Sequence, residues 1–386
     1  MFSKDTLSVI AYAVSKGERP QIDDWSMVIK ELRNHACLSI LMPIKREIGV
    51  PQEILEEIKS ELYQYSAQFV FVMHAQQELL DVLKHNDIIP AVIKGAASAQ
   101  YYELPASRTY GDIDILLHNE AAFNRAIQVL IELGYSPMKD CGELSFEESL
   151  KGSRHFEFAK NGIEVELHSR YVSTGAALDT LLSNSTIVER SLNSWKYTCF
   201  PDMENGLILL QHVKFHINYD GVGLRLLLDW AYYVKNVLSD AFWNDVFEKY
   251  AEELGLKKLA ICLSRICEIY FGLETHMYTK GADETICRDF LETVYESGNF
   301  GVNHSDISKK VSRCLKRNLF SVFRERGIRE SKAIQKYKFL RPFAWIYGAI
   351  SYANIVIHDK GGIRKIFEGK EYNNKQIQLN EKLGLL

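Results

Sequence analysis

Two aspartates, Asp112 and Asp114, stand in the otherwise apolar stretch Gly-Asp-Ile-Asp-Ile-Leu-Leu at 111–117. Alternate side chains of a β-strand point to the same face, so both carboxylates share one face while Ile113 and Ile115 share the other. Two carboxylates at this spacing repel each other unless a cation lies between them. The apolar residues that follow are typical of a buried strand, where unpartnered acids are costly, and we therefore expect a cation site here. The alternative is an edge strand with one solvated face.

The segments around this strand predict an α/β arrangement. A β-branched run at 88–93 is followed by the small, helix-compatible residues of 96–102, and an amphipathic helix is expected at 121–133. Two alternating stretches, 155–159 and 163–168, flank an Asn-Gly dipeptide, which is the strongest short signal for a β-hairpin. We therefore expect a mixed sheet of four or five strands.

Helical patterns lie on both sides of this region. Residues 5–86 carry apolar side chains at helical spacing, including one expected helix over 24–46, and the chain becomes helical again after about residue 201. At 386 residues the chain is long enough for two or three domains. The predicted fold class is α+β (mixed α/β), with a small mixed sheet between N-terminal helices and a C-terminal all-helical domain. The predicted boundaries are a helical segment at 1–86, the α/β domain at 87–200, a helical domain at 201–360 and a polar tail at 361–386.

The composition is that of an ordinary globular protein, and its net charge of −4 gives no global sign of nucleic-acid binding. The seven cysteines are odd in number, irregularly spaced and without a Cys-x-x-Cys pair, which favours reduced thiols over disulfides or a zinc site. The first residues lack the basic and apolar regions of a signal peptide, and no run reaches the roughly 18 apolar residues of a spanning helix. We expect a cytoplasmic protein without a transmembrane segment.

Several short motifs occur in a set order along the chain. They are Lys94-Gly95, Tyr102, Arg108-x-x-Gly111-Asp112-x-Asp114 and Val165-Glu166-Leu167-His168. In order and spacing this set resembles the nucleotidyltransferase superfamily whose prototype is DNA polymerase β, and most closely a large bacterial branch of uncharacterised nucleotidyltransferases. The resemblance covers roughly 60–235 and extends weakly to 337–342. It implies that 87–200 is a catalytic domain of the nucleotidyltransferase fold.

Nucleotidyl transfer explains why three acids would be needed. The reaction attacks the α-phosphorus of a nucleoside triphosphate and expels pyrophosphate, and two divalent ions about 3.5–4 Å apart stabilise the attacking and leaving oxygens. Mg²⁺, or Mn²⁺ in its place, prefers carboxylate oxygens. We assign Asp112 and Asp114 to both ions and Glu166 as the third carboxylate and a candidate general base. Glu164 lies on the same strand face and is the second choice. The alternative for both glutamates is a solvated hairpin face.

The residues around Lys94 and Arg108 are candidates for binding the nucleotide. Lys94 and Gly95 end a strand and open a helix, where backbone N–H groups favour anions, and Ser98 lies one turn further on. The wider superfamily usually has Gly-Ser at this loop, so the side chain that touches the triphosphate stays open; Lys94 pairing with a core acid is the alternative. Arg108 is expected to contact phosphate or to order the aspartates, with a surface arginine as the alternative. Gly111 lets the backbone enter the strand tightly.

A second group of candidates lies in the C-terminal half. His212 and His216 are four residues apart on an expected helix and share a face, but no glutamate completes the His-Glu-x-x-His pattern of a zinc site. The bacterial branch resembles the chain here too. The resemblance implies that His212, Lys214, His216, Arg225 and Asp229 line the nucleotide cleft. The alternative is a hydrogen-bond network between domains without a ligand contact.

The stretch 307–341 is strongly basic in a chain that is slightly acidic overall. Its twelve basic residues are Lys309, Lys310, Arg313, Lys316, Arg317, Arg324, Arg326, Arg329, Lys332, Lys336, Lys338 and Arg341, opposed by Glu325 and Glu330. They are suited to a polyanionic acceptor such as RNA, or to peripheral contact with an anionic membrane beside the apolar residues 343–357. The alternative is a solvated helix face.

Taken together, these features predict a Mg²⁺-dependent nucleotidyltransferase that moves NMP from an NTP to a hydroxyl or phosphate of an unidentified acceptor. The base of the nucleotide is open, and ATP is the first candidate. Two other hypotheses remain. One is a catalytically degenerate module that binds a nucleotide in a regulatory or interaction role. The other is a toxin-like nucleotidyltransferase that acts on tRNA or protein.

Overall fold

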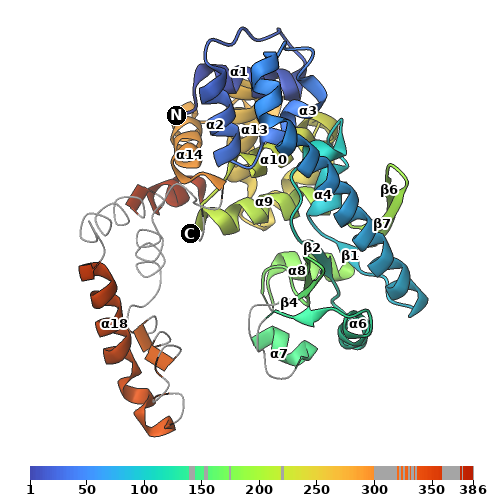
Figure 1. Cartoon of the computed structure of the whole chain (residues 1–386), viewed down its shortest axis with the longest axis vertical. Helices are drawn as coiled ribbons and strands as arrows, with labels where there is room; N and C mark the ends of the chain where they lie inside the picture. The colour runs from blue at the N-terminus through green and yellow to red at the C-terminus, as the bar shows by residue number, and fades with distance from the viewer. Residues whose placement is uncertain are drawn as a thin grey trace. The chain divides into compact units, whose positions relative to one another are not determined.

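The computed structural model divides the chain into two compact units (Figure 1). The larger unit comprises 2–213 and 224–288, and the smaller comprises Met1, 214–223 and the described part of 289–386. The described residues are 1–138, 144–151, 155–173, 175–218, 221–299, 320, 323–324, 327–328, 331, 334, 337–358, 374–375 and 377–385. Every strand discussed below belongs to the larger unit.

A seven-stranded mixed sheet forms the centre of the larger unit, in the order β3-β4-β5-β2-β1-β7-β6. Its strands are β1 (Ala91–Val92), β2 (Ile113–Leu116), β3 (Ser136–Pro137), β4 (His155–Lys160), β5 (Ile163–His168), β6 (Val188–Leu192) and β7 (Trp195–Cys199). Strand β2 runs parallel to β5 and β1 runs parallel to β7, whereas the other neighbours are antiparallel. The mixed α+β fold class is thereby confirmed.

The expected count of four or five strands is wrong, because the β6–β7 hairpin and the two-residue strand β3 join the sheet. The hairpin turns at Asn193, whose φ of 54° is a left-handed conformation that asparagine tolerates. Strand β7 alternates in burial along its length and pairs with β1, so this hairpin extends the sheet by two strands. Strand β1 is shorter than the β-branched run 88–93 that predicted it.

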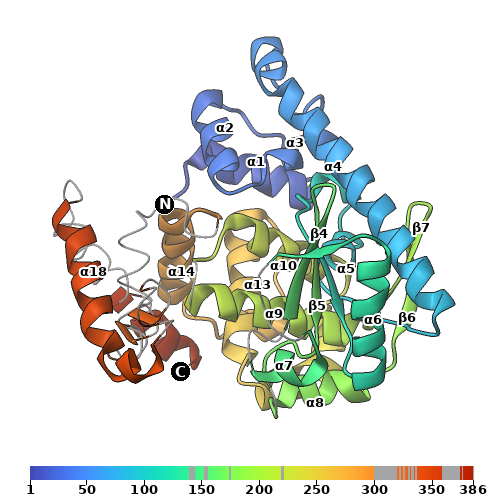
Figure 2. The same cartoon turned by 60° about the horizontal axis from the view of Figure 1, so that its bottom comes forward.

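One face of the sheet is apolar and packs against helices α4 (Gln52–His85) and α6 (Glu120–Glu132), which lie beside it in Figure 2. This core includes Leu83 of α4, Phe123 of α6 and Val165 of β5, each without measurable exposure. The alternation of β5 leaves Glu164, Glu166 and His168 on the opposite face, where the polar residues of the sheet collect.

The N-terminal segment contains α1 (Lys4–Ser15), α2 (Trp25–Asn34), η1 (Leu38–Ile40) and α3 (Leu41–Ile44) before α4. The single helix expected over 24–46 is therefore wrong. It ends at Asn34, and Ala36 adopts a φ of 52°, which is incompatible with helix continuation. Short helices α5 (Gly95–Ala99), η2 (Pro105–Ser107), α7 (Phe146–Lys151) and α8 (Ala177–Asn184) connect the strands.

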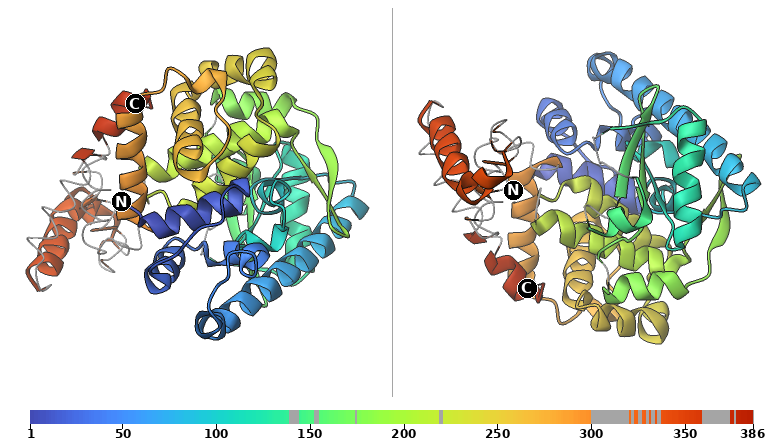
Figure 3. Two further views of the ribbon diagram at one scale, coloured as in Figure 1. Left: turned by 90° about the horizontal axis from the view of Figure 1, so that it is seen from above. Right: turned by 90° about the horizontal axis from the view of Figure 1, so that it is seen from below.

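The remaining described helices follow the sheet in sequence. They are α9 (Asp202–Asn218), α10 (Leu224–Asn236), α11 (Asp240–Phe242), η3 (Trp243–Phe247), α12 (Glu248–Glu253), α13 (Lys257–Phe271), η4 (Met277–Thr279), α14 (Glu284–Ser297), η6 (Lys338–Phe343) and α18 (Ala344–His358). Helix α10 packs against both α1 and α13, so the N-terminal helices lie beside the later ones (Figure 3). The boundaries proposed at 86, 200 and 360 stay predictions.

The smaller unit contains η6 and α18, and the side chains of Phe343 at the end of η6 and of Trp345 and Ile350 on α18 are exposed. Among the described helices, none combines the length and the apolar character needed to cross a bilayer. Of the twelve basic residues in 307–341, the side chains of Arg324 and Arg341 are described, and both are exposed. The backbone of Lys338 is described in η6, and the other nine residues lie outside the described residues, so the predicted anionic partner stays a prediction.

Candidate active site

Strands β2 and β5 bring three carboxylates together. In the parallel register Asp114 lies opposite Glu166, and Asp112 directly precedes β2. One oxygen from each of Asp112, Asp114 and Glu166 lies within 4.8 Å of the others. Asp114 is buried, while Asp112 and Glu166 are half-buried, so this cluster has access to solvent on one side. Glu164 is exposed and lies two residues earlier on β5, outside the cluster.

Lys94 lies at the end of β1 and points its ammonium group into this cluster. Its Nζ is 2.5 Å from Asp114 Oδ1. Burial disfavours the charge, but the carboxylates of Asp114, Asp112 and Glu166 outweigh that cost and raise the pKa of Lys94. The Lys94 backbone has φ 62° and ψ −149°, a region that residues with a side chain rarely adopt. An internal cation therefore accompanies the acids, in agreement with the core ion pair considered from the sequence.

His168 bridges two of the acids. Its Nε2 lies 3.0 Å from Asp114 Oδ1 and 3.0 Å from Glu166 Oε2. Burial opposes protonation, but these two hydrogen bonds raise the pKa of His168. Burial also raises the pKa of Glu166, yet the bond from His168 and the charge of Lys94 lower it to about 2. Glu166 is therefore a carboxylate at neutral pH.

Arg108 is directed to Asp229 on α10. Its Nε donates to Asp229 Oδ1 at 2.9 Å and its second terminal nitrogen donates to Oδ2 at 3.0 Å. The hydroxyl of Tyr102 donates to the same carboxylate at 2.8 Å. Both members of the ion pair are buried. Both residues were site candidates from the sequence, but their pairing was not predicted. The ion pair joins the loop before β2 to helix α10.

The other predicted nucleotide-binding residues fall in several places. Gly95 opens α5 with a φ of 41°, and Ser98 is buried on the same helix. Gly111 has open space where a Cβ would lie and no positive φ, so the tight entry into the strand expected of this glycine is wrong. Arg225 precedes Asp229 by one turn of α10. Burial together with the charge of Arg108 lowers the pKa of Arg225, against the opposing charges of Asp229 and Asp112.

His212 lies on α9 in the larger unit, whereas Lys214 and His216 belong to the smaller one. Burial lowers the pKa of Lys214, and His216 is buried. The expectation that these three side chains line a nucleotide cleft stays a prediction, as do the nucleotide contacts expected of Gly95, Ser98 and Arg225.

Strand β4 adds two polar residues that were not among the predicted site residues. Glu157 lies opposite Glu166, and His155 lies opposite His168. His155 Nε2 is 3.5 Å from Glu157 Oε1 and 4.0 Å from Glu166 Oε1. The signal was available in the sequence, because a hairpin with the two-residue Asn-Gly turn fixes which residues face each other.

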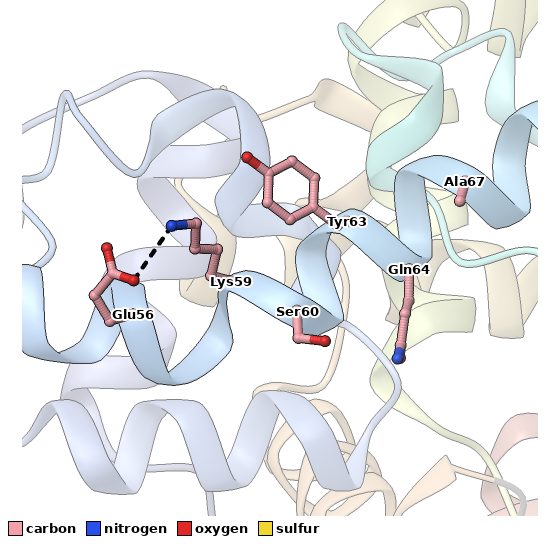
Figure 4. Close-up of a pocket in the computed structure, with 6 residues that line it drawn as sticks. All are labelled: Glu56, Lys59, Ser60, Tyr63, Gln64 and Ala67. Atoms are coloured by element: carbon pink, nitrogen blue, oxygen red, sulfur yellow. Dashed lines mark hydrogen bonds and ion pairs between the residues drawn. The ribbon is translucent and has the colours of Figure 1, made fainter.

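A shallow hollow of about 490 Å³ lies elsewhere, on the outer surface of α4 (Figure 4). Its lining residues are Glu56, Lys59, Ser60, Tyr63, Gln64 and Ala67. All six come from one helix, and none belongs to the acid cluster. The hollow is therefore a groove along a helix surface and is separate from the candidate site.

The carboxylate cluster has the all-oxygen ligand set that Mg²⁺ and Mn²⁺ prefer. A protein-family model described as "Uncharacterised nucleotidyltransferase" matches residues 22–272, which is well over half of the chain. The match includes every strand and all three acids, and it extends beyond both ends of the resemblance seen at 60–235. No curated protein and no solved structure matches the chain. The chain belongs to the family of uncharacterised nucleotidyltransferases.

Proposed function

We propose that this chain transfers NMP from an NTP to a hydroxyl or phosphate of an acceptor, with divalent ions held by Asp112, Asp114 and Glu166. The observation that carries the proposal is the convergence of these three carboxylates within 4.8 Å on adjacent strands. Mg²⁺, or Mn²⁺, is the expected metal because the cluster offers oxygen ligands alone. When bound, two such ions would stabilise charge on the attacking and leaving oxygens.

Lys94 and His168 contact this cluster and keep the Glu166 carboxylate charged. Asp114 contacts both Lys94 and His168, and the low pKa of Glu166 keeps that carboxylate ionised, as a metal ligand must be. A pKa of about 2 makes Glu166 a weak general base, so we assign it to the metal. Lys94 carries its charge on a long, flexible side chain next to the acids. We therefore propose that its ammonium group contacts the triphosphate when a metal ion neutralises Asp114. The backbone of Gly95 and the hydroxyl of Ser98 complete this proposed phosphate contact.

The ion pair between Arg108 and Asp229 holds the loop before β2 against helix α10. Since it joins the loop before β2 to α10, it sets the position from which Asp112 and Asp114 project. Arg225 lies one turn away on α10, where the charges of Asp229 and Asp112 both favour its protonated form, so we propose it as a further nucleotide contact. His212, Lys214 and His216 are further proposed nucleotide contacts, and ATP is the first nucleotide to test.

The test is transfer of α-³²P from each NTP to a panel of sugar phosphates, peptides and RNA, with and without Mg²⁺. Glu166→Gln should lower transfer at least about 100-fold, because a carboxylate that holds the metal cannot be replaced by an amide. Glu164→Gln is the matched control on the same strand, and it should retain transfer. Retained transfer in Asp112→Asn/Asp114→Asn would refute the assignment. Mg²⁺-dependent NTP binding without transfer to any acceptor would favour the degenerate, nucleotide-binding module.

A further inference from the structure

A second cluster of metal-ligating side chains adjoins the three acids on the same sheet face. Strands β4 and β5 place Glu157 opposite Glu166 and His155 opposite His168, so four donor side chains occupy two successive rows. The imidazole rings of His155 and His168 lie 4.8 Å apart between centroids. Ligand atoms of His155, Glu166 and His168 all lie within 4.8 Å of one another. Glu166 thus belongs to two adjacent groups of ligands.

The two groups differ in their chemistry. The first offers carboxylate oxygen only, which suits Mg²⁺. The second offers two imidazole nitrogens with carboxylates, and imidazole suits zinc, cobalt and similar transition ions. We propose that His155, Glu157, Glu166 and His168 form a second metal site that binds a divalent transition ion of the Zn²⁺ and Co²⁺ class.

The ligand atoms of this group lie nearly as close to one another as the ligands around one bound ion would. His168 Nε2 is already 3.0 Å from Glu166 Oε2, and the separations of His155 Nε2 from Glu157 and Glu166 are 3.5 and 4.0 Å. Side-chain exposures of 18% for His155, 25% for Glu157 and 23% for Glu166 give an ion a route from solvent. His168 Nε2 lies 3.0 Å from both Asp114 and Glu166, and a metal bound at this nitrogen would take the place of any proton there and release it to solvent.

The test measures Zn²⁺ affinity of the full chain by chelator competition in His155→Gln, with His74→Gln as the matched control on the exposed side of α4. His155→Gln should weaken Zn²⁺ binding at least about tenfold, as loss of a ligand does, and His74→Gln should not. Asp112→Asn should weaken Mg²⁺ binding and leave Zn²⁺ binding close to that of the wild type. Equal Zn²⁺ affinity in the two histidine variants would overturn the proposal.

A second measurement keeps the proposal testable if a variant folds poorly. X-ray absorption at the zinc edge of the wild-type chain should show scattering from two imidazole rings. Oxygen ligands alone would overturn the proposal. Because Glu166 is shared by the two groups, transfer is measured on the zinc-free chain with Mg²⁺. Absence of transfer there, together with imidazole-ligated zinc in the zinc-loaded chain, would refute the proposed function and support this site.

Discussion

The ion pair between Arg108 and Asp229 allows a quantitative prediction about stability. The exposed fractions of the two side chains are 5% and 1%, and two hydrogen bonds of 2.9 and 3.0 Å join them. Asp229→Asn keeps the shape of the side chain but removes its charge, which leaves the guanidinium buried without a counter-ion. Breaking a buried pair in this way costs about 3–5 kcal/mol. That is a large part of the roughly 5–15 kcal/mol that stabilises a typical domain.

The assay is urea unfolding followed by tryptophan fluorescence, since Trp230 is the residue next to Asp229 on α10. An exposed pair serves as the control: Glu132→Gln removes a 2.9 Å contact with Arg125, and it should change the free energy of unfolding by less than about 1 kcal/mol. The double variant Arg108→Met/Asp229→Leu removes both charges, so it should recover much of the loss. A cost for Asp229→Asn no larger than that of the exposed control would refute the reasoning.

Three further predictions concern the site and its supporting helices. Lys94→Met should lower the thermal stability of the metal-free chain and enlarge the rise in melting temperature caused by Mg²⁺, because it removes the ammonium beside the acids; an equal Mg²⁺ response in wild type and variant would contradict this. Gly206→Ala should cost about 1–3 kcal/mol in urea unfolding, because a Cβ there would collide with the Tyr233 ring, whereas Gly281→Ala, with open space around it, should be near neutral. The raised pKa of His168 contributes stability that is complete below pH about 6.5 and is lost as pH rises through the folded-state pKa. His168→Gln should therefore reduce the fall in unfolding free energy between neutral and alkaline pH, and an unchanged slope would count against the bridge that His168 forms.

The sequence predicts the aspartate strand and the hairpin well, because both depend on local spacing. The preference for Glu166 over Glu164 could not be settled from the sequence, since it depends on how β5 aligns with β2 across more than forty residues. Hydrophobic patterning tells which face of a strand is buried but does not tell which residue of a distant strand lies opposite.

The pairing of Arg108 with Asp229 is a contact of this non-local kind, because 121 residues separate the two. A buried arginine requires a counter-ion, but the sequence contains several acids that could serve and does not indicate which one pairs with Arg108. For the same reason the sequence left two partners open for Lys94, a phosphate of the nucleotide or an acid in the core. The contact of Lys94 with Asp114 follows from the antiparallel pairing of β1 with β2.

The contacts between helices α10 and α1 determine where the folded unit begins. Its residue Tyr232 donates to the Ala13 carbonyl at 3.2 Å, and Lys235 donates to the Val14 carbonyl at 2.8 Å, both at the end of α1. Val9 and Ile10 of α1 are completely buried, yet α1 lies before residue 22, where the family match begins. A fragment trimmed to the matched residues would leave the apolar surfaces of α10 and α13 uncovered and prone to aggregate. A shortened chain that keeps the matched region should therefore start at the N-terminus of α1.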